Sequence, residues 1–404
     1  MGSRRLVSDQ NMNARFASAL AAVFVGFSST CLPKAKAASP GVVPLPAGDQ
    51  SYRNELQHAV DRGSAWLASN QNSNGWWSTP DQPAVTALAL LALRADPSSK
   101  ASERYADAVA KGYRFLRSCA QPNGGIHRTN LPTYNTSLSL MALLASPSPE
   151  HDALARKARA FLVRLQGDFG EKGKTDTVFD GGIGYGSKYE HSDMGNTVQA
   201  LEAIYYSRRL LRDQPSGEPD LNWDALRSFL QNCQNLPSHN TQTWVSDNPK
   251  DKGGFVYYPG HSMAGGVTNE VTGKVALRSY GSISYAGMMS YIYADLKPSD
   301  PRVTAVKEWL SSNYTLQENP GMGPQGLFYY YHTMAKALNV AGMDSLKLVD
   351  GSVVPWRREL SARLLNLQQR DGSWSNDNAR WWEKDASLVT SYGILILSIA
   401  HRGL

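Results

Sequence analysis

The sequence has few cysteines, and this limits how the fold can be held together. Only three cysteines occur in 404 residues, and Cys31 lies inside an N-terminal apolar segment. Cys119 and Cys233 remain, too few for a disulfide-stapled scaffold. They fall at equivalent places in different repeats, which would keep their Cα atoms too far apart to bond. We therefore expect two free thiols.

Net charge and long apolar runs are also scarce. The formal charge of +6 falls to +2 without residues 1–37, because that segment holds five basic residues and one acid. No basic stripe stands out, which argues against nucleic-acid binding. The apolar run FASALAAVFVGF is too short to cross a bilayer. We predict no transmembrane segment in the mature chain, and peripheral membrane contact stays open.

The first 37 residues have the layout of a secretory signal peptide. Arg15 precedes the apolar run, and Ala35-Lys36-Ala37 matches an A-x-A cleavage site. Cleavage near Ala37 would leave residues 38–404 as one exported domain, periplasmic or extracellular. Lipid attachment at Cys31 is the alternative, which the Ser-Ser-Thr before this cysteine disfavours.

The stretch RGSAWLASNQNSNGWWS, residues 62–78, recurs along the chain. The equivalent anchor positions are Gln71, Ala120, Gln166, Gln234, Tyr314 and Gln368. Their spacings of 49, 46, 68, 80 and 54 residues indicate one repeated unit with two long insertions. An internal repeat determines the architecture more strongly than chain length does.

A second apolar segment with helical spacing follows each anchor. These segments begin at Ala84, Tyr134, Met194, Ser279, Leu327 and Ala386. The unit is therefore helix, Gly/Trp turn, helix, and such units must stack to bury their apolar faces. Because the second helices are apolar most of the way round, we predict an all-α ring of six hairpins, an (α/α)6 toroid, with these helices inside. An open solenoid is the alternative.

Smaller features are expected at the helix starts and in one insertion. Asn135, either Ser192 or Asp193, and Asp385 precede or open inner helices and are predicted to act as N-caps. Two runs with strand-like composition, residues 253–260 and 271–280, are predicted to pair as one β-hairpin in the fourth-repeat insertion.

The turn sequence resembles the QW motif of squalene and oxidosqualene cyclases. Arg62-Gly63, Trp66-Leu67, Gln71, Gly75 and Trp77 follow its full spacing. Further copies, full or partial, contribute Gln166, Gln234, Gln368, Gly372 and Trp374. The resemblance implies an α/α toroid of the squalene cyclase and prenyltransferase superfamily. Each QW glutamine would bond the end of a neighbouring helix, and each tryptophan would stack against it.

Two families with similar helical rings can be checked by asking whether this chain has the residues that their chemistry requires. Protein prenyltransferases need a zinc site with an Asp-x-Cys pair, but Arg117 and Gln231 stand two residues before the cysteines. Thioester domains need a GCGEQ-like loop, and residues 118–121, SCAQ, lack its glycine and glutamate. We therefore predict no metal and no cofactor.

Class II terpene cyclases, which the repeat also resembles, begin by protonating an alkene or epoxide. Their DxDD motif supplies the acid, and this chain has no DxDD. The nearest equivalent is Glu383-Lys384-Asp385-Ala386, which would make Asp385 the proton donor and Glu383 the first acid. The alternative is that Asp385 only caps the last inner helix.

A second polar cluster opens the third inner helix. It contains Tyr189, Glu190, His191, Asp193 and Asn196, and it could serve in acid–base chemistry or only cap the helix. If the inner-helix starts converge on one mouth, His191 and Asp193 join the catalytic candidates. The candidate substrate-binding residues are Tyr134, Asn135, Asn196, Tyr280, Tyr285, Tyr330, His332, Trp381 and Trp382. Simple helix packing is the alternative explanation for the tyrosines and for His332.

The resemblance and the export signal lead to one main functional hypothesis. We expect an exported terpene cyclase-like isomerase that acts on an isoprenoid lipid in the lumen of the ring. One alternative is a non-catalytic toroid that binds a lipid, a glycan or a protein. The other is an enzyme like the polysaccharide lyases or glycosidases, which use paired acids or Tyr/His. The expected partner is a small hydrophobic or glycan ligand.

Overall fold

A computed structural model describes residues 47–98, 101–187, 191–211 and 219–404. The predicted signal peptide and the lipidation alternative at Cys31 lie outside the described residues, as do Tyr189 and Glu190. The described chain is mostly helical, with two small antiparallel strand pairs.

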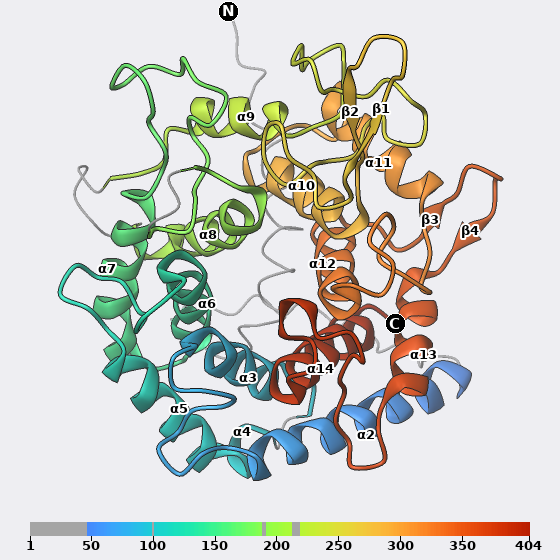
Figure 1. Cartoon of the computed structure of the whole chain (residues 1–404). Helices are drawn as coiled ribbons and strands as arrows, with labels where there is room; N and C mark the ends of the chain where they lie inside the picture. Colours follow the sequence, from blue (N-terminus) through green and yellow to red (C-terminus); the bar gives the residue numbers. More distant parts are fainter. Residues whose placement is uncertain (1–46, 99–100, 188–190, 212–218) are drawn as a thin grey trace, which may run out of the picture.

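The inner wall is a closed ring of helices around a central axis (Figure 1). Each inner helix packs on the next one in the chain, and the last, α14, packs on the first, α3. In chain order they are α3 (Pro83–Ala95), α6 (Pro132–Ala145), α8 (Met194–Ser207), α10 (Gly281–Tyr293), α12 (Leu327–Val340) and α14 (Ala386–Gly403). The predicted α/α toroid is confirmed, and the open solenoid is wrong.

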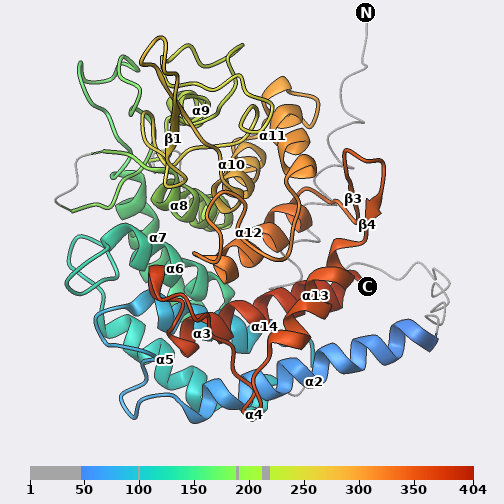
Figure 2. The same cartoon turned by 45° about the vertical axis from the view of Figure 1, so that its right-hand side comes forward.

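A second set of helices lies outside this ring (Figures 1 and 2). It consists of α2 (Ala47–Ser69), α5 (Ala106–Ser118), α7 (Asp152–Val163), α9 (Trp223–Asn232), α11 (Pro301–Ser312) and α13 (Trp356–Leu367). Short helical segments occur at α4 (Ala101–Arg104), η1 (Pro149–His151), η2 (Arg208–Leu211) and η3 (Arg380–Trp382). Each outer helix packs on at least one inner helix.

The two layers differ in how apolar they are, as their sequences require. In α3, every residue from Pro83 to Leu93 is buried, because neighbours cover this helix on most sides. Helix α5 instead buries one face, with Gly112, Tyr113, Phe115 and Leu116, and turns charged residues outward. The apolar content of each helix thus determines its layer.

The turns between the layers hold each hairpin to the next outer helix. Gln71 Nε2 donates to Gly75 O and to Ala108 O in the first turn of α5, at 2.9 and 2.8 Å. Gly75 has φ +96°, and a Cβ there would lie 2.4 Å from Lys111 O, so only glycine fits this turn. Equivalent bonds run from Gln166 to Asn222 O, Gln234 to Arg302 O and Gln368 to Ala59 O.

Two tryptophans complete the first and last turns. Trp77 and Trp374 are fully buried, and their indole N–H groups donate to Leu67 O at 2.7 Å and Leu364 O at 2.9 Å. Trp76 is only half-buried and packs against the rim of the core. Of the adjacent tryptophans, therefore, Trp77 belongs to the scaffold.

The predicted hairpin exists, but its first strand is wrong. Strand β1 (Gly266–Thr268) pairs with β2 (Val275–Leu277), whereas residues 253–260 carry no strand of this pair. Asn269 explains the register, because its side chain accepts from Val271 N and Thr272 N and closes a tight turn directly before β2. A second pair, β3 (Leu346–Lys347) and β4 (Val353–Val354), was not expected.

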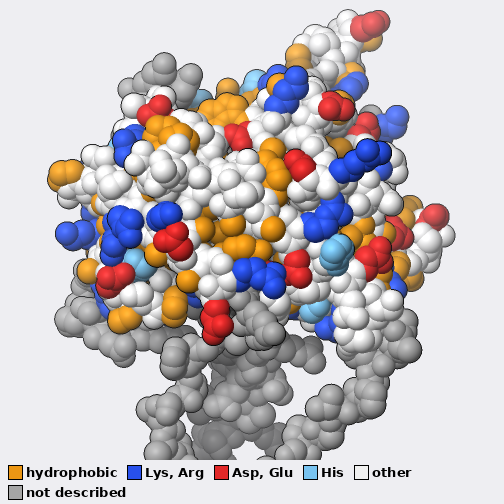
Figure 3. Space-filling model, turned by 90° about the horizontal axis from the view of Figure 1, so that it is seen from below, with side chains coloured by type: hydrophobic (Ala, Val, Ile, Leu, Met, Phe, Trp, Pro, Cys, Tyr) orange, Lys and Arg blue, Asp and Glu red, His pale blue; other side chains and the backbone are white. Residues whose placement is uncertain are grey.

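Three further expectations can be compared with the described residues. Cys119 and Cys233 are both buried and free. None of the helices described combines the length and the apolarity that a membrane crossing requires. On the face seen in Figure 3, basic and acidic side chains are interspersed, so that face presents no basic stripe.

Candidate functional site

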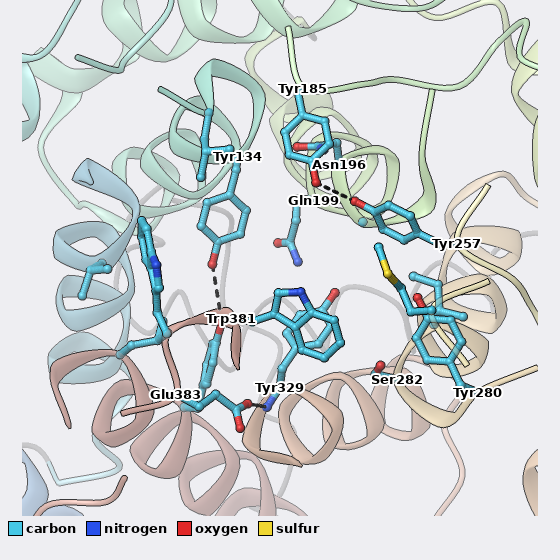
Figure 4. A pocket seen from close by; sticks show the side chains of 18 residues that line it. Tyr134, Tyr185, Asn196, Gln199, Tyr257, Tyr280, Ser282, Tyr329, Trp381 and Glu383 are labelled. Atoms are coloured by element: carbon cyan, nitrogen blue, oxygen red, sulfur yellow. Dashed lines mark hydrogen bonds between the residues drawn. The ribbon is translucent and has the colours of Figure 1, made fainter. Parts of the chain in front are cut away.

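A cavity of about 320 Å³ opens where the inner helices begin (Figure 4). Its walls come from the first turns of the inner helices and from the loops that enter them. The lining residues are Val85, Leu131, Tyr134, Tyr185, Gly195, Asn196, Gln199, Tyr257, Met263, Tyr280, Ser282, Ile283, Tyr329, Trp381, Trp382, Glu383, Leu388 and Tyr392. Eight of these are Tyr or Trp, none is Lys, Arg or His, and Glu383 is the one carboxylate among them.

Three lining residues have left-handed backbone that side chains rarely adopt. Leu131, Trp381 and Trp382 have φ of 50°, 53° and 65°. Such conformations cost about 1–3 kcal/mol each and gather at ligand sites. The indole of Trp381 projects over the cavity in Figure 4. It packs closely against Gly326, where an added Cβ would lie 2.8 Å from the indole ring. Both tryptophans are more than 40% exposed (41% and 46%), so they form the mouth.

Glu383 joins the mouth loop to the start of α12. Its Oε1 accepts from Tyr329 N and its Oε2 from Asn376 Nδ2, both at 2.7 Å. Burial raises the pKa of this carboxyl above its usual value, while these hydrogen bonds act in the opposite direction. Glu383 therefore holds the mouth loop against the start of α12 and is also the only carboxylate in the cavity lining.

Asp385, predicted as a proton donor or a cap, caps α14. Its Oδ1 accepts from Ser387 N at 2.8 Å and Leu388 N at 3.2 Å, and Ser78 Oγ bonds the other oxygen. Asp385 does not contribute to the cavity lining. The capping alternative accounts for all of these contacts.

Asp193 lies behind the cavity wall and is fully buried. It caps α8 through Asn196, whose backbone N and side-chain Nδ2 both donate to its carboxyl at 2.8 Å. Burial raises the pKa of Asp193 to about 6, while hydrogen bonds from Asn196 and Tyr257 lower it. The Oη of Tyr257 lies 2.8 Å from the Oη of Tyr185, and both rings line the cavity.

His191 lies next to this carboxyl but outside the cavity lining. Its ring packs against Tyr258 in a tilted arrangement, with centroids 4.3 Å apart and the planes at 41°, and its Nδ1 lies 3.4 Å from Ser192 O. His191 acts on the Asp193 carboxyl electrostatically, and none of His191, Asp193 and Asp385 belongs to the cavity lining. Their predicted catalytic roles stay predictions.

Five of the nine predicted substrate-binding residues line the cavity and four do not. The five are Tyr134, Asn196, Tyr280, Trp381 and Trp382, and the predicted catalytic residue Glu383 lines it as well. Asn135 is buried inside α6 rather than at its cap, since α6 begins at Pro132. Asn135 Oδ1 accepts from Ala84 N at 2.9 Å, so this residue caps the neighbouring helix α3.

The other three residues pack in the wall. Tyr330 donates to Thr315 O at 2.9 Å, and Tyr285 is buried against the Tyr330 ring. His332 stacks on Tyr392 with centroids 4.7 Å apart. Burial and the nearby Lys336 charge lower the pKa of His332 well below its usual value. These contacts agree with the alternative explanation, in which Tyr285, Tyr330 and His332 serve helix packing.

Several lining residues were missed by sequence reasoning. Gln199 and Tyr392 lie one turn beyond Asn196 and Leu388 on the same helix faces, so helical spacing could have found them. Tyr329 precedes the singled-out Tyr330. Tyr185 and Tyr257 lie on loops, where no periodicity identifies them.

A metal centre has no visible donor set in the described parts of the chain. No group of three or more His, Cys, Asp or Glu residues gathers there in a way that could hold an ion. The expectation of no metal and no cofactor stays a prediction.

Comparisons with known proteins reveal the fold. No family model matches the sequence, and no curated protein matches it. A variant of the type II terpene cyclase MstE from Scytonema, solved with geranylgeranyl dihydroxybenzoate, is 13% identical with a TM-score of 0.50, over 88% of this chain and 100% of that one. A D-mannose isomerase is 12% identical with a TM-score of 0.53, over 89% and 100%. A GH76A α-1,6-mannanase from Salegentibacter is 12% identical with a TM-score of 0.49, over 85% and 99%. The first two likenesses show a shared α/α toroid and nothing more specific.

Proposed function

We propose that this chain is an exported terpene cyclase-like isomerase that holds an uncharged isoprenoid lipid in the cavity of its ring. Residues 1–37 would be removed as a signal peptide, and residues 38–404 would form one domain. The ring would be built from six hairpins with QW-type turns, as in the squalene cyclase superfamily.

The observation that carries this proposal is the composition of the cavity wall. Eight aromatic rings and no basic side chain line it. A ligand with a phosphate would find no cation there, whereas an apolar chain would be desolvated by the rings. A carbocation formed on that chain would be stabilised by cation–π contacts with Tyr and Trp.

The acid that begins such a reaction is assigned to Glu383 rather than Asp385. Glu383 contacts the cavity, and its burial favours the protonated form. Its proton would add to one carbon of an alkene and leave a cation at the other. Loss of a proton from a neighbouring carbon would re-form a double bond. The product has the same composition as the substrate, so no co-reactant is needed.

A non-catalytic lipid carrier is the second candidate, and one observation favours it. Both oxygens of Glu383 accept hydrogen bonds, an arrangement that stabilises the ionised carboxylate and opposes proton donation. The glycosidase-like alternative has less support, because Glu383 is the single carboxylate in the lining and two are needed.

Lipid binding and turnover can be measured on the same preparation. The chain lacking residues 1–37 is mixed with squalene, with geranylgeraniol and with geranylgeranyl diphosphate. Tryptophan fluorescence reports binding, and gas chromatography with mass spectrometry reports products of unchanged mass. We expect the two uncharged lipids to bind more tightly than the diphosphate.

The outcomes separate the candidates. Isomer formation that is lost in Glu383→Gln, with binding retained, supports the isomerase. Binding without any product supports the carrier. If neither uncharged lipid binds, or the diphosphate binds best, the proposed ligand class is wrong.

A further inference from the structure

Asp193 is connected to the cavity through two tyrosine hydroxyl groups. The Tyr257 phenol lies close to the buried carboxyl of Asp193: a Cβ on Gly195 would lie 3.2 Å from Asp193 Oδ1 and 3.6 Å from Tyr257 Oη, and this phenol lowers the pKa of the carboxyl. Its hydroxyl oxygen lies 2.8 Å from that of Tyr185, and Figure 4 shows both hydroxyls meeting at the cavity wall. A series of adjacent polar groups thus leads from a carboxyl without solvent exposure to the space where a ligand would lie.

Contacts from the starts of α8 and α6 hold this path in place. Met194 N donates to Tyr257 O at 2.8 Å, which fixes the Tyr257 segment on the start of α8. Thr133 Oγ1 donates to Gly184 O at 2.7 Å, which fixes the residue before Tyr185 on the start of α6. Gly195 leaves room between Asp193 and Tyr257, since a Cβ there would lie 3.2 Å from each side chain. Groups fixed in this way need little rearrangement before they react.

We propose that Asp193, Tyr257 and Tyr185 form a proton relay whose cavity end, Tyr185, removes a proton from the bound ligand. This inference rests on the proposed isomerase function and names the base for it. Tyr185 Oη takes the proton from a carbon next to the cation, and the C–H electrons form the new double bond. Tyr185 passes its own proton to Tyr257 Oη, and Tyr257 passes its proton to the Asp193 carboxylate. The positive charge of the ligand and the negative charge of Asp193 cancel. Asp193 then releases its proton and Glu383 takes one up, by exchange with water, which restores both groups for the next turnover.

The electrostatics of the relay agree with this direction of transfer. The pKa of Asp193, raised by burial to about 6, leaves it ionised at neutral pH but ready to accept a proton. Burial and the Asp193 charge raise the pKa of Tyr257, so Tyr257 stays a neutral phenol that can both donate and accept. The other titratable groups acting on this carboxyl are His191, Tyr280 and Cys233. His191 is the one that carries positive charge when protonated, and its effect lowers the pKa of Asp193.

A test without ligand examines the coupling itself. In protein with 13C-labelled tyrosine, the Cζ resonance of Tyr185, identified by its loss in Tyr185→Phe, should shift with a midpoint near pH 6. The shift should vanish in Asp193→Asn and in Tyr257→Phe. A Tyr185 resonance that ignores pH in this range, or that still titrates in both variants, overturns the relay whether or not the protein is an isomerase.

A second test uses turnover. Tyr185→Phe, Tyr257→Phe and Asp193→Asn should each slow isomer formation by about 100-fold or more, and the double variants should lose little beyond the single ones. Ligand affinity should change less than threefold, and the acidic limb of the pH–rate profile should disappear. Tyr258→Phe, which removes a hydroxyl next door outside the cavity lining, should behave like the wild type. Rates that fall equally in Tyr258→Phe, or losses that multiply across the relay variants, contradict the relay.

Discussion

Replacing Trp77 by alanine tests whether the glycine–tryptophan turn holds the ring together. The indole is fully buried, and truncating a buried Trp to Ala costs about 3–5 kcal/mol. Its N–H also satisfies Leu67 O at 2.7 Å, and losing that bond adds about 1 kcal/mol. We therefore expect a loss of about 4–6 kcal/mol in the free energy of unfolding.

Two comparison variants separate the parts of this effect. Trp77→Phe keeps most of the apolar ring and removes the indole N–H, so it should cost about 1–3 kcal/mol. Trp76→Ala removes the half-buried neighbour and should cost about 1 kcal/mol or less. The order of stability should be wild type, Trp76→Ala, Trp77→Phe and Trp77→Ala.

Urea unfolding followed by far-UV circular dichroism measures these differences, provided that the slopes agree among variants. Equal midpoints for Trp76→Ala and Trp77→Ala would refute the reasoning. So would a Trp77→Phe variant as unstable as Trp77→Ala, because the burial of the ring would then count for nothing.

Three further predictions concern the ring closure, the buried acid and the mouth. In Gly372→Ala, the new Cβ would lie 2.7 Å from Arg62 O, at a residue with φ +96°. Gly351→Ala is the control, because Gly351 also has positive φ but has open space around its Cβ position. Measured by urea unfolding, Gly372→Ala should lose about 2 kcal/mol more of the free energy of unfolding than Gly351→Ala. Asp193 has its pKa raised from 3.8 to about 6, so the stability that its protonated form gives is complete below about pH 4 and is lost as pH rises through about 6. As pH rises from 4 to 7, the free energy of unfolding of Asp193→Asn should therefore increase relative to that of the wild type by up to about 3 kcal/mol. The measurement is the difference in Tm between the two proteins as a function of pH, and a difference that does not change with pH would contradict this prediction. Because Trp381 has φ +53°, Trp381→Gly should be about 1 kcal/mol more stable than Trp381→Ala, the reverse of the usual order, and calorimetry decides.

The toroid could be predicted from the sequence because its construction is periodic. Residues such as Gln71, Gly75 and Trp77 reach only the adjacent helices, so a local pattern carries the information about the contact. The same reasoning placed Tyr134 and Asn196 correctly, because the first turns of all inner helices meet at one mouth.

The rest of the site depends on contacts that local patterns do not encode. A carboxylate before a helix looks the same whether it caps that helix or faces a ligand, and Asp385 proves to be the cap. Tyr185 and Tyr257 lie far apart in sequence and meet only because separate loops converge on α6 and α8. The error in the first strand of the β-hairpin has a similar origin. Residues 253–260 lie in the segment between helices α9 and α10, where Phe255 and Gln234 form an isolated β-bridge.

The last turn of the ring holds the first outer helix. Gln368 reaches Ala59 O, Arg62 reaches Gln369 O and the Trp66 indole reaches Asp371, contacts of the kind that join successive hairpins elsewhere. An open array of repeats has two weak ends from which it unzips one unit at a time. A ring closed in this way offers no such starting point, since opening any junction exposes two faces at once. Protease resistance should therefore disappear along the whole chain together, and the chain termini could be moved to another exposed loop without creating a frayed end.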